Sequence, residues 1–325
     1  MITDTQEETK AQEAAQAATD RAYMARCLQL AAGGLLGAKP NPMVGAVIVA
    51  PDGRVIGEGY HVRCGEGHAE VNAFASVAEA DEPLLPQSTM YVSLEPCAHF
   101  GKTPPCADLI ISKGVRRVVV GCVDPFAKVS GRGIRKLTDA GISVTVGVME
   151  QECLWLNRRF ITANTLRRPY ITLKWAQSAD GFIDDHFRPT MFSTPFTQTL
   201  SHKLRAESDA ILVGRTTDER DHPQLNVRHW SGSDPLRIAL GHHTNLKTLV
   251  DELYERGVQS LIVEGGAATH NSFLAAGLWD EIRRETAPMV VGSGTKAPAL
   301  PQGNLRLLSS DRYDGNTIEV FARKG

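Results

Sequence analysis

The chain has 325 residues, of which 42% are hydrophobic and 22% are charged, and its formal net charge is −2. This composition is ordinary for a globular protein, and the length is sufficient for two hydrophobic cores. The near-zero charge argues against broad binding to nucleic acid or to a membrane surface, and no run approaches the roughly 20 apolar residues that span a bilayer. A phosphate-bearing ligand must therefore be held by a local group of donors.

Residues 1–19 are polar and acidic, and they lack the basic start and apolar core of a secretory signal. We expect a disordered or loosely helical tail here, and a cytoplasmic protein. From Asp20, a candidate N-cap, the pattern predicts an amphipathic helix. Strands are predicted on both sides of an Asp52–Gly53 turn. The elements that follow are helices at 68–80 and 104–114, strands at 89–97 and 115–125, and a helix and strand within 132–148.

This alternation predicts a layered α/β domain over residues 20–149, followed by a connecting helix and linker over 150–169. A second alternating series predicts another α/β domain over 170–325. Its strands are expected within 170–181, 208–217, 235–241, 258–266 and 317–325, and its helices at 196–207, 246–257 and 269–282.

Four residues of the first domain have the types and spacing of a catalytic zinc site. His68, Cys97 and Cys106 would supply three nitrogen and sulfur ligands and leave a fourth position for water. Two prolines precede Cys106 and place it at a predicted helix N-terminus, where the helix dipole favours thiolate. A metal held in this way lowers the pKa of its water toward neutrality.

Glu70 lies two residues after His68, about 200° around an ideal helix from it. This position does not suit a fourth ligand, but it allows the carboxylate to reach the water from another side. We therefore predict that Glu70 is the proton shuttle, which moves a proton from water to the substrate nitrogen and the leaving ammonia.

The chain has six cysteines, an even number that would allow three disulfides. In a cytosolic chain of this length, metal ligation or burial is the better interpretation. Cys27, Cys122 and Cys153 are expected in the core. Cys64 is also expected to be buried, although its spacing from His61 would suit metal ligands.

His61 is expected to contact substrate or to lie behind the metal ligands. An alternative metal site uses His99 in place of His68 as part of a closed structural zinc site. That alternative leaves Glu70 without a role.

The signature of nucleobase deaminases is H-x-E followed by P-C-x-x-C. Here "HAEVNA" keeps the first half, while "LEPCAHFGKTPPC" stretches the second half to C-x8-C. With "KPNPMVGAVIV", "GEGYH" and "DPFAKVSGRG", these segments closely resemble the bifunctional deaminase/reductase family of riboflavin biosynthesis, from about Asp20 to the end of the chain. The resemblance implies a cytidine-deaminase-like three-layer α/β/α domain followed by a dihydrofolate-reductase-like α/β domain.

In the deaminase domain the resemblance implies that five further residues contact the substrate: Asn41, His61, His99, Lys102 and Thr103. Phe126 stands where the family often has asparagine, so no ribose or phosphate contact is assigned there.

The second domain has no G-x-G-x-x-G motif after a strand. "VEGG" at a strand end allows close approach of a nucleotide or forms a simple turn. "LKWAQSADG", "DHPQLNVR" and "VEGGAATHNSFL" resemble the family's reductase half, which uses NADPH. The resemblance implies substrate contacts at Arg205, Leu225, Arg228 and Glu264, with both arginines suited to a phosphate. It implies a cofactor site lined by Ala176, Thr217, Asp221 and Gly266. The alternative for Arg205 is a solvated helix face.

One departure concerns the strand "PLRIALG", after which the family continues through a further strand and loop of some tens of residues. This chain passes directly to the next helix, near residues 241–247, and Gly241 replaces the acidic residue expected there. The hypothesis is that the reductase half is weakened, inactive or completed by a partner subunit. The shortening is either natural or a gap in the sequence.

The resulting prediction is a zinc-dependent deaminase of 2,5-diamino-6-(5-phosphoribosylamino)pyrimidin-4-one that also reduces the ribosyl group to ribityl with NADPH. The resemblance implies a homodimer or larger homo-oligomer. The rivals are a deaminase of cytosine or adenosine, disfavoured by the C-x8-C insert and the second domain, and a regulatory protein with a structural zinc, disfavoured by Glu70. No nucleic-acid or membrane partner is expected.

Overall fold

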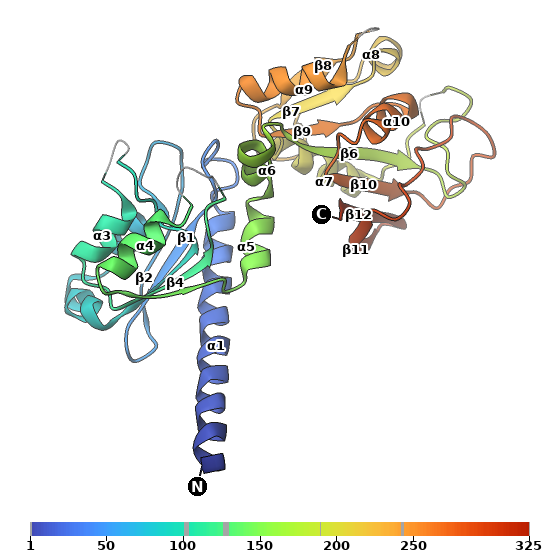
Figure 1. Cartoon of the computed structure of the whole chain (residues 1–325). Helices are drawn as coiled ribbons and strands as arrows, with labels where there is room; N and C mark the ends of the chain where they lie inside the picture. The colour runs from blue at the N-terminus through green and yellow to red at the C-terminus, as the bar shows by residue number, and fades with distance from the viewer. Residues whose placement is uncertain (1, 101–103, 126–129, 189, 242–243, 325) are drawn as a thin grey trace. The chain divides into compact units, whose positions relative to one another are not determined.

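The computed structural model describes residues 2–100, 104–125, 130–188, 190–241 and 244–324. The chain divides into two compact units, Met1–Thr165 and Leu166–Gly325. Each unit contains one sheet flanked by helices (Figure 1). Within the described ranges, no helix is both long enough and apolar enough to cross a membrane.

The first unit is built on a five-stranded sheet in the order β2-β1-β3-β4-β5. β1 is antiparallel to both β2 and β3, whereas β3, β4 and β5 run parallel. The strands are β1 (Gly45–Val49), β2 (Val55–Tyr60), β3 (Thr89–Leu94), β4 (Arg117–Cys122) and β5 (Ser143–Val146).

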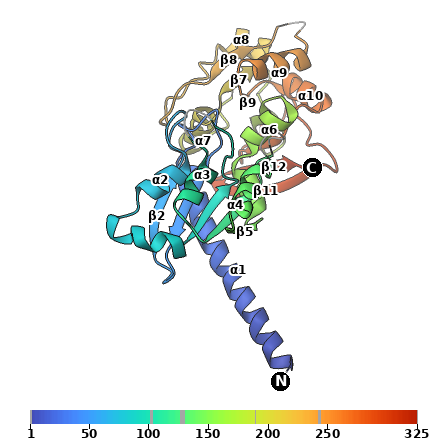
Figure 2. The ribbon, with the colours of Figure 1, turned by 60° about the vertical axis from the view of Figure 1, so that its left-hand side comes forward.

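Helices cover both faces of this sheet, because side chains of successive strand residues point to opposite faces. On one face, Ile48 and Val120 pack with α2 (Ala69–Ala75), α3 (Cys106–Ser112) and α4 (Arg132–Asp139). On the other, Val47 and Val119 pack with α1 (Ile2–Ala32) and α5 (Glu150–Leu156). The strands and helices expected within 45–148 are present, with the short 3₁₀ helix η1 (Glu79–Gln87) between α2 and β3. Figure 2 shows the unit from a second direction.

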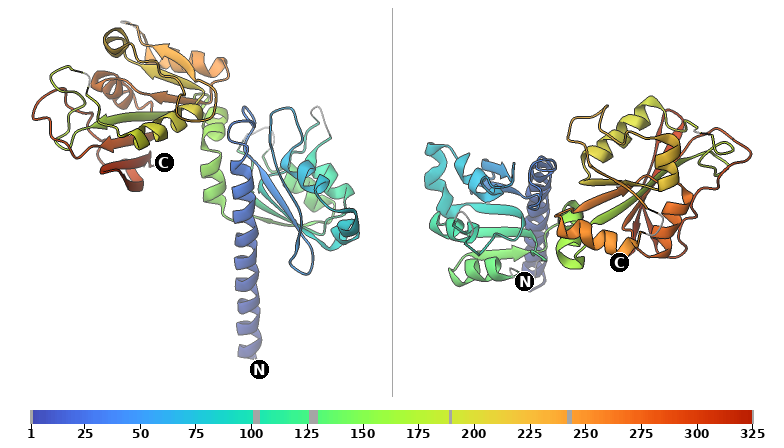
Figure 3. Two further views of the ribbon diagram at one scale, coloured as in Figure 1. Left: turned by 180° about the vertical axis from the view of Figure 1, so that it is seen from behind. Right: turned by 90° about the horizontal axis from the view of Figure 1, so that it is seen from above.

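The first helix begins at Ile2 and not at Asp20, so the expectation of an N-cap at Asp20 was wrong. The polar segment before Asp20, expected as a disordered or loosely helical tail, continues this helix. Asp20 lies inside α1 and is buried. Its carboxylate accepts hydrogen bonds from the Arg117 guanidinium at 2.8 and 2.6 Å and from the Tyr91 hydroxyl at 2.9 Å. In the sequence, a helix aspartate that pairs with strand residues cannot be told from an N-cap aspartate, because the residue type is the same. The start of α1 extends beyond the sheet (Figures 1 and 3).

The segment expected as a connecting helix and linker, 150–169, contains two helices, α5 and α6 (Arg158–Leu166). Cys153 of α5 is buried in the core beneath the sheet. The two units separate after Thr165. Most of this segment is therefore part of the first unit.

The second unit has a seven-stranded sheet in the order β11-β12-β10-β6-β9-β7-β8. Ala210 and Leu212 pack with α9 (Leu246–Glu255) and α10 (Ala267–Ala275), while Ile211 packs with α7 (Pro195–Ala206). Helices therefore lie on both faces (Figure 3). The strands are β6 (Tyr170–Gln177), β7 (Ala210–Val213), β8 (Leu236–Ala239), β9 (Ser260–Val263), β10 (Glu281–Thr286), β11 (Leu305–Tyr313) and β12 (Asn316–Arg323).

Three elements of this unit were not expected from the sequence: α8 (Arg215–Asp221), β10 and β11. The residues of β10, "EIRRET", lack an apolar alternation because their charges are paired inside the sheet. Arg284 donates to Glu319 of β12 at 3.0 Å, and Glu285 accepts a hydrogen bond from Asn316 at 2.6 Å. β11 is an edge strand whose residues are exposed or only partly buried. Its sequence therefore lacks the apolar pattern that predicts a buried strand.

Candidate active sites

Three predicted metal ligands come together beside the first sheet. His68 is the N-cap of α2, Cys97 follows β3, and Cys106 is the first residue of α3. The Nδ1 atom of His68 lies 3.4 Å from the Cys106 sulfur and 3.7 Å from the Cys97 sulfur. The three donor atoms all lie within 4.8 Å of one another.

These separations fit a tetrahedral zinc site. With zinc–sulfur bonds of about 2.3 Å and zinc–nitrogen bonds of about 2.0–2.1 Å, a tetrahedron sets nitrogen and sulfur about 3.6 Å apart. The Cys106 backbone N–H donates to the Cys97 sulfur at 3.2 Å. The pKa of Cys97 falls to about 4, first because of the hydrogen bond from the Cys106 thiol and also because of His68. This direction favours the thiolate form that a metal ligand requires.

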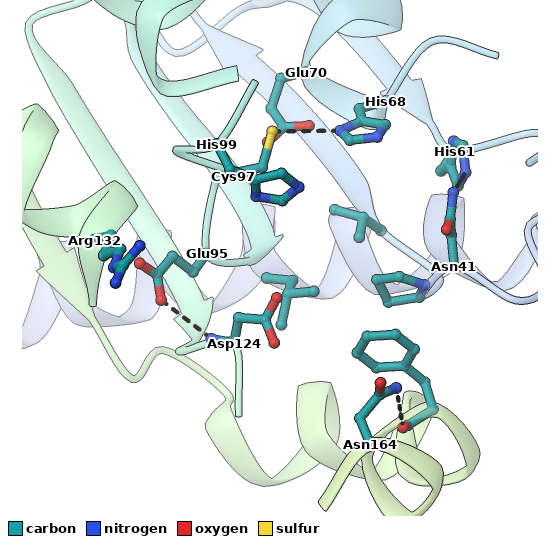
Figure 4. A pocket seen from close by; sticks show the side chains of 14 residues that line it. Asn41, His61, His68, Glu70, Glu95, Cys97, His99, Asp124, Arg132 and Asn164 are labelled. Atoms are coloured by element: carbon teal, nitrogen blue, oxygen red, sulfur yellow. Dashed lines mark hydrogen bonds between the residues drawn. The ribbon is translucent and has the colours of Figure 1, made fainter. Parts of the chain in front are cut away.

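Glu70 lies beside this donor group, on α2, and is 3% exposed. Burial raises the pKa of its carboxyl group to about 7. A carboxyl group with a pKa near the working pH can both accept and return a proton. Among the described residues, Glu70 is outside the set of converging donors but faces the same pocket (Figure 4).

Asn41 and His61 form a hydrogen-bonded pair next to the donor group. The His61 Nδ1 atom lies 3.1 Å from the Gly67 carbonyl oxygen, so this nitrogen carries the proton. Its Nε2 atom therefore accepts from the Asn41 side-chain amide at 3.0 Å. Burial lowers the pKa of His61, which favours this neutral form. Both ring nitrogens are engaged, and His61 orients Asn41 instead of joining the metal donors.

The other cysteines agree with the sequence expectation except at one position. All six thiols are free, and Cys27, Cys122 and Cys153 are buried. Cys64 is exposed, so the expectation that it is buried was wrong. It lies in a turn in which its backbone N–H reaches the Gly37 carbonyl at 3.0 Å. A lone apolar-looking residue among glycines and charged residues carries no periodicity from which burial can be judged.

A cavity of about 560 Å³ opens onto these groups (Figure 4). The residues predicted from the sequence that line it are Asn41, His61, His68, Glu70, Cys97 and His99. The predicted contacts Lys102 and Thr103 and the departure at Phe126 lie outside the described residues. His99 lines the cavity, but the converging donors in the described ranges are His68, Cys97 and Cys106.

Eight lining residues were not predicted. Four are apolar, Pro42, Val44, Leu94 and Phe160, and four are polar, Glu95, Asp124, Arg132 and Asn164. Phe160 and Asn164 belong to α6, inside the segment expected to be a connecting helix and linker. The acidic residue of "LEPC" was a usable signal for Glu95, because a carboxylate at the end of a buried strand needs polar partners.

In the second unit, the predicted substrate residues Arg205 and Glu264 form a bidentate ion pair. The Arg205 Nε and Nη2 atoms donate to the two Glu264 oxygens at 3.0 and 2.6 Å. Burial raises the pKa of Glu264, but the charges of Lys174 and Arg205 outweigh this effect and lower it. Lys174, on β6, was not predicted. The solvated-helix alternative for Arg205 is wrong, because its side chain is only 14% exposed.

The other two predicted substrate residues lie on the loop after α8. Leu225 is buried against Leu204 of α7, with a φ of 53°. The Arg228 guanidinium donates to the side-chain oxygens of Gln224 and Asn226 at 2.5 and 2.6 Å. Both of these partners are neutral, so they do not cancel the positive charge of the guanidinium, which can still attract an anion.

The predicted cofactor residues come from different elements. Gly266 is the N-cap of α10, and a Cβ atom added to it would lie 3.5 Å from the Thr217 hydroxyl of α8. Ala176 is on β6 and pairs in register with Glu285. Asp221 ends α8 and accepts from Arg220 at 2.7 and 3.0 Å. The structure thus brings Thr217 and Gly266 together.

Two family models match the chain. The model for the cytidine and deoxycytidylate deaminase zinc-binding region matches residues 17–122. The model for the RibD C-terminal domain matches in two overlapping pieces, residues 169–248 and 235–318. The fold class expected from the sequence is confirmed.

Among individual relatives, the riboflavin biosynthesis protein RibD of Aquifex aeolicus (strain VF5) is 38% identical over 320 residues, covering 85% of this chain and 88% of that protein. The protein of the same name from Escherichia coli (strain K12) is 34% identical over 352 residues, covering 90% of this chain and 94% of its own.

Solved structures agree over nearly the whole chain. A structure from Thermotoga maritima, described as a diaminohydroxyphosphoribosylaminopyrimidine deaminase/5-amino-6-(5-phosphoribosylamino)uracil reductase, is 32% identical with a TM-score of 0.86. It covers 95% of this chain and 99% of its own. RibD from Acinetobacter baumannii gives a TM-score of 0.84 at 31% identity, covering 95% of this chain and 100% of its own. The chain therefore belongs to the RibD family of riboflavin biosynthesis, which joins a zinc-binding deaminase domain to a reductase domain.

Proposed function

We propose that the first unit deaminates 2,5-diamino-6-(5-phosphoribosylamino)pyrimidin-4-one and that the second reduces the ribosyl group of the product to ribityl with NADPH. The observation that carries the proposal is the convergence of His68, Cys97 and Cys106 beside a buried Glu70 in one cavity. The relatives' shared assignment to riboflavin biosynthesis supports the choice of substrate.

In the deaminase site, His68, Cys97 and Cys106 would hold zinc. When bound, the ion supplies the Lewis acidity that makes water a nucleophile near neutral pH. Glu70 takes a proton from the attacking water and delivers it to the leaving amine, so one water is consumed and one ammonia released. The Asn41–His61 pair orients the pyrimidine, with Asn41 fixed by its hydrogen bond to the histidine. His99, Lys102 and Thr103 complete the contacts from the insert between the cysteines.

In the reductase site, Arg205, Leu225, Arg228 and Glu264 contact the substrate, and Ala176, Thr217, Asp221 and Gly266 line the NADPH site. Arg228 is suited to a phosphate because neutral oxygens alone hold its guanidinium. The lowered pKa of Glu264 keeps this carboxylate charged at neutral pH.

We also propose that a segment after β8 is missing relative to the family. The reductase model matches in two pieces that meet around residues 235–248. The alignment to the Aquifex protein spans 320 residues but covers only 85% of this chain. The Aquifex protein therefore has residues where this chain has gaps. A second candidate function follows: a deaminase whose reductase half is inactive or depends on a partner. A homodimer or larger homo-oligomer, and a cytoplasmic location, stay predictions from the sequence.

A two-stage assay tests the proposal. Ammonia release from the diaminopyrimidinone is measured first without NADPH, and NADPH oxidation is then followed spectrophotometrically. Release followed by oxidation supports both steps, whereas release without oxidation supports the second candidate. Ammonia release only from cytosine, cytidine or adenosine would replace the proposed substrate with another base.

A further inference from the structure

The cavity of the first unit has a cationic residue at the beginning of α4, away from the metal donors. Arg132 lines this cavity with its side chain exposed. It is the only arginine or lysine among the described lining residues. We infer that Arg132 binds the 5′-phosphate of the deaminase substrate and so selects phosphorylated over unphosphorylated pyrimidines; this inference rests on the proposed function.

The backbone on both sides of Arg132 is fixed by one buried carboxylate. Glu95 is 7% exposed and accepts from the N–H groups of Gly131 at 2.9 Å and Gly133 at 2.8 Å. It also accepts from the N–H groups of Asp124 at 3.2 Å and Ile134 at 3.4 Å. Arg132 is therefore held between two anchored neighbours, and its side chain starts from a rigid point. A preformed position reduces the entropy lost when a ligand binds.

The same carboxylate ties Arg132 to the metal donors. Glu95 lies two residues before Cys97 and directly after β3. α4 also approaches this segment closely, since a Cβ atom added to Gly133 would lie 1.9 Å from the Pro96 carbonyl oxygen. Only glycine fits there. Backbone contacts consequently fix the distance between Arg132 and the metal donors. A fixed distance suits a site that binds a substrate by both its reacting ring and its phosphate.

The charges around Arg132 leave it free to meet an anion. Glu95 is neutralised locally by its four N–H donors and by the positive end of the α4 dipole. Because these N–H groups are occupied by Glu95, they are not available to a phosphate, and Arg132 is the cationic group that the described lining offers to it. Within the described parts of the chain, no carboxylate lies within ion-pair distance of Arg132, whereas Lys136 on the same helix is paired with Asp108.

Figure 4 shows Arg132 beside Glu95, across the cavity from His61 and Asn41. The Asn41–His61 pair and the metal donors thus lie toward one side and the guanidinium toward another. A pyrimidine carrying a phosphoribosyl group has the same polarity, with the reacting ring at one end and a dianion at the other. Arginine presents two parallel N–H donors to such a phosphate.

The test compares ammonia release from the phosphorylated substrate and from its dephosphorylated nucleoside, using wild type, Arg132→Met, Arg132→Lys and the control Arg135→Met. Arg135 is exposed on the same helix but does not line the cavity. We expect Arg132→Met to raise KM for the phosphorylated substrate by about 10- to 100-fold, the range for a lost charge-assisted hydrogen bond. Its kcat, its zinc content and its KM for the nucleoside should stay near wild type, and Arg132→Lys should recover part of the loss.

Inhibition by ribose 5-phosphate supplies a second measurement, which should weaken in Arg132→Met but not in Arg135→Met. The inference is overturned if Arg132→Met matches wild type, or if it affects both substrates equally. If wild type itself releases no ammonia from the phosphorylated substrate, the proposed function fails instead. The two failures are therefore distinguishable.

Discussion

Arg205 and Glu264 are 59 residues apart in the chain but form one two-point ion pair, with N–O distances of 3.0 and 2.6 Å. Both were predicted separately to contact the reductase substrate. The pair uses the Arg205 Nε and Nη2 donors, while Nη1 reaches the Asn226 carbonyl at 3.3 Å. Arg205 therefore holds Glu264 and the loop that carries Arg228 in place. The charge of Arg205 is paired with a carboxylate, whereas the guanidinium of Arg228 is bound to neutral oxygens of Gln224 and Asn226.

The first prediction concerns removal of one member of this pair. Arg205→Met leaves the Glu264 carboxylate buried without its partner and should lower the free energy of unfolding by about 3–5 kcal/mol. Chemical denaturation measures this change. The control Arg215→Met removes an exposed arginine paired with Glu219 and should change stability by less than about 1 kcal/mol.

The double variant Arg205→Met/Glu264→Leu separates stability from function. Replacing both charges with apolar groups should restore most of the lost stability. NADPH oxidation should nevertheless stay low, because the substrate then lacks both polar contacts. A fully active double variant would show that neither residue meets the substrate.

A second prediction uses the pH dependence of the Asp20–Arg117 pair. Burial raises the pKa of Asp20, but hydrogen bonds from Arg117 and other donors outweigh it, and the net shift is downward. A lowered folded-state pKa stabilises the fold above the ordinary carboxyl pKa, and this contribution is lost as the pH falls through the lowered value. Asp20→Asn should cost about 2 kcal/mol at pH 7.

The stability difference between wild type and Asp20→Asn should begin to shrink below about pH 5 and vanish below the lowered pKa. Urea denaturation from pH 7 to pH 3 checks this. Asp139→Asn, at an exposed position of α4, serves as the control and should show no comparable change. A difference that grew on acidification would contradict the assigned sign.

A third prediction isolates proton transfer. Glu70→Gln keeps the size of the side chain but cannot accept a proton, so ammonia release should fall by at least about 10²-fold while zinc stays bound. Glu66→Gln, at an exposed position in the same segment, should be near wild type. Unchanged ammonia release in Glu70→Gln would remove Glu70 from the mechanism.

A fourth prediction concerns the metal. Cys106→Ala removes one of three converging donors and should reduce the zinc content of the purified protein and abolish deamination. Cys64→Ala removes an exposed thiol and should leave one zinc per chain. Elemental analysis with parallel ammonia assays measures both. Full zinc content in Cys106→Ala would show that other side chains hold the metal.

The sequence indicated the strands and helices whose apolar patterns face a core. β1, β3, β4 and β9 are short buried runs, and the Asp52–Gly53 turn has the residues that a tight hairpin requires. It could not indicate β10, because six residues with four charges look like a surface segment until their partners on β12 and in the loops are known.

By itself, the sequence determined the chemistry at the first site: one imidazole, two thiols and a carboxylate at spacings that suit a catalytic metal. Those are properties of residue type and local spacing. Only the tertiary structure decided which residues join them. Glu95 follows β3, Asp124 follows β4, Arg132 begins α4, and α6 supplies both Phe160 and Asn164. These parts of the chain meet in the cavity only once it has folded around the sheet. A residue that contacts a distant segment can do so whatever residues stand beside it in the chain. The local sequence pattern therefore does not reveal the contact.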